Sequence, residues 1–113
     1  ATAIRIGKPA RGEQAIEAAQ QSSGKIIAAR DDEILAAQKI LASEGVWVEP
    51  ASAAGLAGLL NEVRSGRVEV KVQRVVVVCT GHGLNDPSII TESFQAPKII
   101  SASYESLLAQ IGF

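Results

Sequence analysis

The chain has 113 residues, 47% of them hydrophobic, and its acidic and basic side chains nearly balance at a net charge of −1. This size and composition are typical of one compact unit, so we expect residues 1–113 to form a single α/β piece. The chain lacks the basic stripe of a nucleic-acid binder and the run of ~18 apolar residues that a membrane helix needs, so we expect neither partner.

The scarcity of cysteine and histidine restricts the chemistry further. Cys79 is the single cysteine and His82 the single histidine, which excludes an internal disulfide and a metal site built from these residue types. A lone cysteine is typical of a reduced, cytoplasmic setting. The chain also contains no methionine and opens on ATAIRIG, which carries no start signal for a helix or strand. We therefore expect a piece of a longer chain.

The first half of the sequence predicts a loop, two helices and a short strand. Residues 12–24 read as an Ala-rich helix that ends at a Ser-Ser-Gly stop, and residues 25–29, KIIAA, as a brief strand. Residues 31–45 predict a second helix, with Asp31 or Asp32 as its N-cap and a glycine stop. The apolar face of this helix comprises Ile34, Ala37 and Leu41.

A strand and a narrow helix follow. Residues 46–48, VWV, predict a short strand, and residues 49–66 a helix with Pro50 in its first turn. Helical spacing predicts a buried face made of Leu56, Leu59, Leu60 and Val63. Small residues make the same helix thin, so another segment could pack very close to it; they are Ala51, Ala54, Gly55 and Gly58.

The last third completes an alternation of strands and helices. Residues 68–72 predict an edge strand or an ordered linker, and residues 74–79, RVVVVC, a central parallel strand that is apolar on both faces. A loop with two prolines then leads to a final helix from about Ser101 or Ser103, whose apolar face comprises Tyr104, Leu107, Leu108 and Ile111. The alternation predicts an α/β fold of three layers around a largely parallel sheet.

Two of the predicted strands end in polar residues. Glu49 follows the strand at 46–48, and Thr80-Gly81-His82-Gly83 follows the strand at 74–79. Ligands bind at the carboxyl ends of parallel strands, so these residues could share one small-molecule site. Each also has a plain structural reading: Thr80 as a turn-forming hydroxyl, Gly81 and Gly83 as turn glycines, and Glu49 as a favourable charge at a helix start.

Three motifs give the chain a resemblance to a known family. ATAIRIGKP (1–9), EGVWVEPASAAGLAGL (45–60) and VVVVCTGHGLNDP (75–87) look like the threonine synthases, pyridoxal-phosphate enzymes of fold type II with a tryptophan synthase β-like architecture. The order and spacing of the motifs resemble the C-terminal part of that family, and the resemblance covers most of the chain.

The resemblance implies roles for individual residues. Thr80 is similar to the family residue whose hydroxyl hydrogen-bonds the pyridine nitrogen of pyridoxal 5′-phosphate, and Gly81 and Gly83 would let the backbone approach the flat ring. Glu49 resembles the start of the segment that lines the other edge of the cofactor. The family commonly has lysine where this chain has Asn85.

The resemblance also implies a reaction and its limits. Family members convert O-phospho-L-homoserine and water to L-threonine and phosphate. The Schiff-base lysine and the cup for the cofactor phosphate would lie upstream of residue 1, so the chain would hold no catalytic lysine, would be inactive alone, and would act within a homodimer. Two other readings stay open: a sister lyase, such as threonine dehydratase or cysteate synthase, and a non-catalytic α/β binding module.

Overall fold

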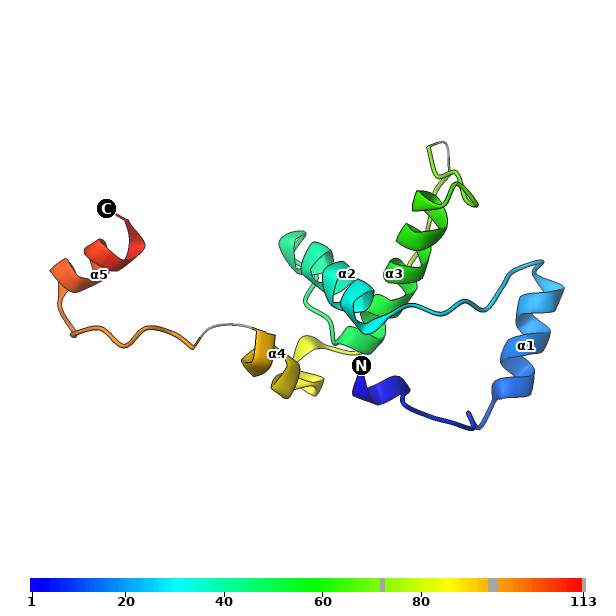
Figure 1. The fold of residues 1–113 in the computed structure, drawn as a ribbon, viewed down its shortest axis with the longest axis horizontal. Coiled ribbons are helices and arrows are strands. Elements are labelled where there is room, and N and C mark those ends of the chain that lie inside the picture. The colour runs from blue at the N-terminus through cyan, green and yellow to red at the C-terminus, as the bar shows by residue number, and fades with distance from the viewer. Residues whose placement is uncertain (72, 94–95, 113) are drawn as a thin grey trace.

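The computed structural model describes residues 1–71, 73–93 and 96–112 as a string of helices (Figure 1). Their bounds are η1 Thr2–Ile4, α1 Gly12–Gln21, α2 Asp31–Ser43, α3 Pro50–Arg64, η2 Gly83–Asn85, α4 Pro87–Ser93 and α5 Tyr104–Ile111. The four helices that the sequence predicts are confirmed as α1, α2, α3 and α5.

Two local predictions need correction. Arg30, and neither of the two aspartates, occupies the N-cap position of α2, where its backbone N–H donates to the Glu33 carboxylate at 2.8 Å. The segment that was predicted to be a loop forms α4, which begins at Pro87. Proline suits a first helical position because its fixed φ matches the helix and no N–H is needed there.

The predicted strands are not formed by the described residues. Residues 25–29, 74–79 and the described part of 68–72 have no regular secondary structure, and Val48 makes a single antiparallel bridge with His82. A strand needs a neighbour about 4.8 Å away to pair its backbone groups, and these segments lack one here. The strand predictions are therefore corrected for this chain, and its structure is helical.

The core lies where α2 crosses α3 (Figure 1). Among the described residues its buried apolar side chains are Ile34, Ala37, Val48, Ala53 and Ala57. The predicted apolar face of α2 is thus confirmed. On α3 the prediction is confirmed in part, because Leu56 and Leu60 pack against the core but stay half-buried, while Ala53 and Ala57 are the buried apolar residues of this helix.

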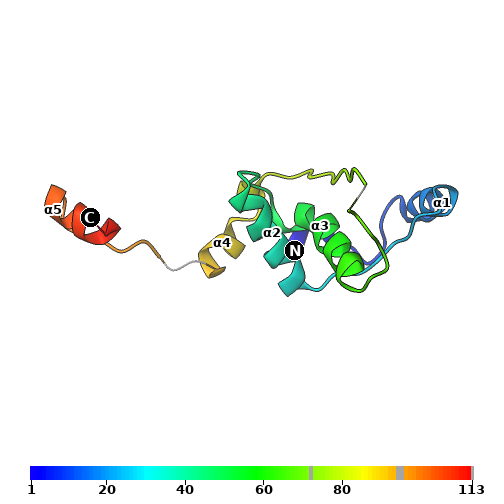
Figure 2. The same ribbon diagram turned by 90° about the horizontal axis from the view of Figure 1, so that it is seen from above.

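The described chain is extended and not compact. Its radius of gyration is 18.7 Å and its extents are 62 × 35 × 19 Å, whereas a compact chain of this length would have a radius near ~13 Å. α1 and α5 lie at opposite ends (Figure 2), and neither has a buried residue among those described. Apolar side chains stay exposed in the segment 74–79, with Val76 at 82% and Val78 at 74%.

The segment 25–29 is held against α3 by two contacts. A Cβ added at Gly58 would lie 2.9 Å from Ile27 Cδ1, so the predicted close approach to the thin face of α3 is confirmed. Glu62, 6% exposed, accepts hydrogen bonds from Lys25 Nζ and from Arg67, whose Nη2 lies 2.7 Å away. The hydrogen bonds from these two cations lower the Glu62 pKa from 4.5 to about 2.

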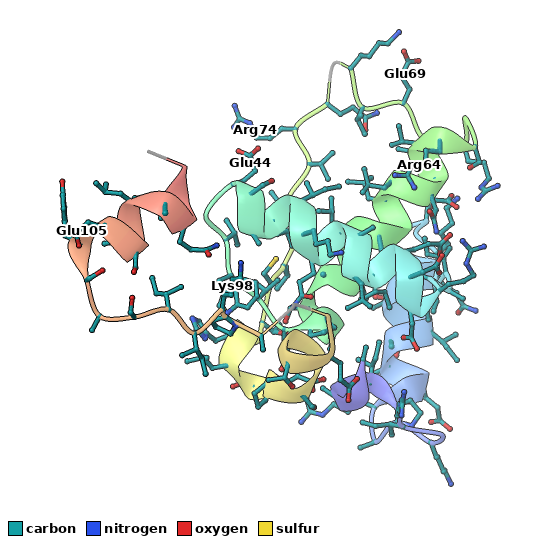
Figure 3. All side chains as sticks on the ribbon, turned by 60° about the vertical axis from the view of Figure 1, so that its left-hand side comes forward. Glu44, Arg64, Glu69, Arg74, Lys98 and Glu105 are labelled. Carbon is teal, nitrogen blue, oxygen red and sulfur yellow. The ribbon has the colours of Figure 1, made fainter. Side chains whose placement is uncertain are left out.

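Other charged side chains lie within helices, at helix ends and on the connecting segments. Figure 3 shows Glu44 after α2, Arg64 at the end of α3, and Glu69 and Arg74 on the segment beyond it. Arg64 stands in the last turn of α3, where a cation favours the helix dipole. None of the helices in the described ranges is long and apolar enough to cross a membrane.

Candidate functional site

Two segments far apart in the sequence meet beside the start of α3. Val48 and His82 form the antiparallel bridge, and backbone hydrogen bonds flank it from Glu49 N–H to Gly81 O at 3.1 Å and from Gly83 N–H to Trp47 O at 3.4 Å. Residues 47–49 and 80–83 therefore lie side by side, joined by an antiparallel bridge and not as the ends of parallel strands. We call these two segments the bridged turn.

Ser52 joins the bridged turn to α3. It is the third residue of the helix and only 4% exposed. Its Oγ accepts hydrogen bonds from the backbone N–H groups of Thr80 at 3.2 Å and Gly81 at 2.7 Å, and lies 3.2 Å from Thr80 Oγ1. One buried hydroxyl thus holds the turn that carries the exposed Thr80 side chain.

Glu49 lies directly against Gly81. A Cβ built on Gly81 would stand 2.1 Å from Glu49 Oε1 and 2.3 Å from its Cδ. The Glu49 carboxyl thus occupies the space of a side chain at Gly81, whose φ is not positive, so a larger residue here would displace the flexible Glu49 side chain. The site thus brings the carboxylate of Glu49 and the hydroxyl of Thr80 close to the same glycine, Gly81.

Trp47 lies in the same way against Gly83. A Cβ on the buried Gly83 would be 2.1 Å from Trp47 Nε1 and 2.4 Å from Cε2. The indole therefore closes over the backbone of this glycine. In this structure the protein's own side chains fill the space beside both glycines, and the predicted approach of a cofactor ring to them stays a prediction.

His82 serves the turn itself. Its Nδ1 accepts the backbone N–H of Leu84 at 3.2 Å and so caps η2. When the ring is neutral, this bond places the proton on Nε2. The imidazole is exposed, and its observed contact supports the structural reading of this residue.

The lysines lie outside the bridged turn. Lys25 is bound to Glu62 at the far part of α3, and the other four are exposed: Lys8, Lys39, Lys71 and Lys98. Lys98 stands on the segment between α4 and α5 (Figure 3). A hollow of about 530 Å³ is lined by residues 7–14 and 16, near the start of α1, and contains no residue of the bridged turn. The described ranges hold no group of three His, Cys, Asp or Glu that could bind a metal ion.

Sequence reasoning missed three residues that shape the site. The sequence showed Ser52 only as part of the motif at residues 45–60, Trp47 as part of a strand and as a bulky packing residue, and Gln38 only as part of a helix. Gln38 is buried and its Nε2 donates to Val48 O at 2.7 Å, which holds the backbone of Val48 in the bridged turn against α2. No local signal marks Ser52, because its hydrogen-bond partners lie 28 and 29 residues away along the chain.

Comparisons with known proteins agree on one family. The sequence profile of the family "Pyridoxal-phosphate dependent enzyme" matches residues 1–81, which include Glu49, Ser52, Thr80 and Gly81. The chain is 45% identical over 113 residues to a threonine synthase of Mycobacterium leprae, a match that covers 99% of this chain and 31% of the relative. It is 52% identical over 96 residues to a threonine synthase of Bacillus sp. strain ULM1 (84% and 27%).

A third relative has the same name and a similar identity. A threonine synthase of Methanocaldococcus jannaschii is 44% identical over 98 residues, covering 86% of this chain and 24% of the relative. The chain spans about a third or less of the length of the curated relatives it matches.

Proposed function

The chain belongs to the family of pyridoxal-phosphate dependent enzymes, and from this premise we propose that it is the C-terminal part of a threonine synthase. The observation that carries the proposal is the identity of 45% to a threonine synthase across 99% of the chain. The complete enzyme would be a cytoplasmic homodimer that converts O-phospho-L-homoserine and water to L-threonine and phosphate.

Thr80 fits the polar end of the cofactor, whereas the side chains of Glu49 and Trp47 occupy the space beside Gly81 and Gly83 in this structure and would have to move to admit the ring. Pyridoxal phosphate presents a ring nitrogen that needs a polar partner and a flat ring that needs close backbone. Thr80 offers an exposed neutral hydroxyl, fixed by a buried serine, next to two residues without side chains. A ligand for the cofactor phosphate is not part of this arrangement, so we assign the phosphate and the Schiff-base lysine to the rest of the enzyme.

Each residue of the turn would have a distinct task. The bound cofactor supplies the electron sink for the carbanions of the reaction. Thr80 would hold the ring nitrogen by a hydrogen bond without keeping it protonated, since a hydroxyl is a far weaker base than a carboxylate. Gly81 and Gly83 would leave the backbone close to the ring, and Glu49 would line its edge.

The exposed apolar segments support a largely parallel sheet in the complete enzyme. Most valines and isoleucines of residues 74–79 and 25–29 are exposed in this structure, Ile26 at 66% and Val76 at 82%, whereas Ile27 packs against Gly58 of α3. In the complete enzyme we expect these segments to pair with neighbouring strands in a largely parallel sheet with helices on both sides. Burying them would remove the unfavourable contact of these side chains with water.

The division of the site can be tested by trapping the cofactor. The complete enzyme, loaded with pyridoxal phosphate and reduced with borohydride, should carry the adduct on a lysine outside residues 1–113, located by peptide mass spectrometry. An adduct on Lys25 or on another lysine of this chain would overturn the division. The parallel sample without reductant controls for non-specific attachment.

The reaction is tested by product release. The complete enzyme should release phosphate from O-phospho-L-homoserine, whereas the purified 113-residue chain should release none. Steady turnover by the 113-residue chain would refute the claim that it holds only part of the site. Release of ammonia from threonine in place of phosphate would assign the enzyme to the sister dehydratases.

A further inference from the structure

Ser52 makes more hydrogen bonds than its place in a helix requires. The hydroxyl of a serine within a helix commonly donates to the backbone carbonyl about four residues earlier, or it faces water. Ser52 instead lies buried, and its described contacts reach across 28 and 29 residues to the backbone of Thr80, its side chain, and the backbone of Gly81. These contacts decide where the proton of each hydroxyl lies.

The two backbone contacts fix the role of the serine oxygen. A hydroxyl has one hydrogen to donate and two lone pairs to accept with. The N–H groups of Thr80, at 3.2 Å, and Gly81, at 2.7 Å, can only donate, so they fill both lone pairs of Ser52 Oγ. The remaining hydrogen of Ser52 then points to Thr80 Oγ1, which lies 3.2 Å away.

The consequence falls on Thr80. Because Thr80 Oγ1 accepts the hydrogen of Ser52, it cannot donate its own hydrogen back along the same contact. The Thr80 hydrogen is therefore directed away from Ser52, on a side chain that is exposed. The contact with Ser52 thus keeps the Thr80 hydrogen on the exposed side of the hydroxyl, beside its one remaining lone pair, so that the hydroxyl is set to donate there.

We propose that Ser52 is a positioning residue that sets Thr80 as the hydrogen-bond donor to the unprotonated pyridine nitrogen of the cofactor. The inference rests on the proposed function, which places Thr80 at that nitrogen. A donor stabilises the nitrogen only when it is unprotonated, so it lowers the pKa of the ring nitrogen. Without Ser52 the Thr80 hydroxyl is free to turn and accept, which favours the protonated ring.

The test measures the protonation of the ring nitrogen directly. The complete enzyme is loaded with pyridoxal phosphate labelled with ¹⁵N in the ring, and the ¹⁵N resonance is followed against pH in the wild type, S52A, T80V and the double variant. We expect S52A and T80V both to raise the ring-nitrogen pKa, with the larger rise in T80V. The double variant should match T80V, because Ser52 acts through the Thr80 hydroxyl.

A matched serine controls for the loss of a hydroxyl. Ser65 ends the same helix and donates to Asn61 O at 2.8 Å, so S65A removes a comparable hydrogen bond far from the turn. Its ¹⁵N titration should equal that of the wild type. S52C, which keeps a weak donor and acceptor of similar size, should fall between the wild type and S52A, and it replaces S52A if the alanine variant does not fold.

The outcomes separate the two levels of the proposal. If T80V leaves the ¹⁵N titration unchanged, Thr80 does not face the ring nitrogen and the proposed site fails. If T80V shifts the titration but S52A and S52C match the wild type, the site stands and the role of Ser52 is overturned. A fall in melting temperature without a ¹⁵N shift in S52A likewise assigns Ser52 a purely structural role.

Discussion

Replacing Gly83 by alanine tests how closely Trp47 covers the bridged turn. The new Cβ would lie 2.1 Å from Trp47 Nε1, about 1.3 Å short of the 3.4 Å at which ordinary contact begins. The indole is rigid, so the whole ring must retreat or the turn must shift. Overpacking of this kind costs about 1–3 kcal/mol, and we expect G83A to lower the free energy of unfolding by that amount.

A double-mutant cycle isolates the contact. Chemical denaturation of the complete enzyme, followed by circular dichroism, compares G83A in the wild-type and the W47A backgrounds. Removing the indole removes the atoms that the new methyl group meets, so G83A should cost less than ~0.5 kcal/mol in W47A, within the scatter of independent sites.

Two further glycines serve as controls for the same substitution. G81A meets the Glu49 carboxyl, the mobile end of a flexible side chain, and should cost less than G83A. G7A places its methyl group where nothing lies within 4 Å and should be neutral or slightly stabilising. An equal cost of G83A in both Trp47 backgrounds would refute the packing argument.

Three more substitutions test contacts around α3 in the complete enzyme. The folded pKa of Glu62, about 2, lies below its ordinary 4.5, so the stabilisation by ionised Glu62 is complete above pH 4.5 and lost as the pH falls towards 2. E62Q should therefore reduce the pH dependence of the free energy of unfolding in that window, and an unchanged slope would contradict this. G58A should gain about 1 kcal/mol of helix propensity, but the new methyl group crowds Ile27 Cδ1 and cancels this gain. In an I27V background, which lacks that atom, G58A should raise the stability, as thermal unfolding in the two backgrounds would show. Q38A removes the donor to Val48 O and should cost about 1–3 kcal/mol in urea unfolding, and a smaller loss would count against that bond.

The sequence predicts the helices well because their signals are local. The small-residue run and Pro50 mark α3, Ser103 caps α5 by accepting the Ser106 N–H, and the spacing of Ile34 and Ala37 marks the buried side of α2. α4 was missed because Pro87 was treated as a loop signal, although proline also suits the first turn of a helix.

Properties that depend on distant partners were not predictable in the same way. A valine-rich segment forms a strand only when another strand lies beside it, and the described part of this chain offers residues 74–79 no such neighbour. The meeting of Glu49 with Gly81 was only a possibility from the sequence, and it arises through an antiparallel bridge and not through the ends of parallel strands. The role of Ser52 was not predictable, because its partners lie 28 and 29 residues away and no local pattern names them.

The bridged turn has a consequence for how such a site can change over evolution. The hydrogen bonds that flank the bridge join main-chain atoms, from Glu49 to Gly81 and from Gly83 to Trp47, and main-chain atoms are the same in every residue type. The side chains at positions 49, 80 and 82 can therefore be exchanged for others while the backbone keeps its path. The two glycines are the exceptions, since neighbouring side chains fill their space. A turn held by main-chain hydrogen bonds can therefore acquire new chemistry by single side-chain substitutions while its backbone conformation is kept.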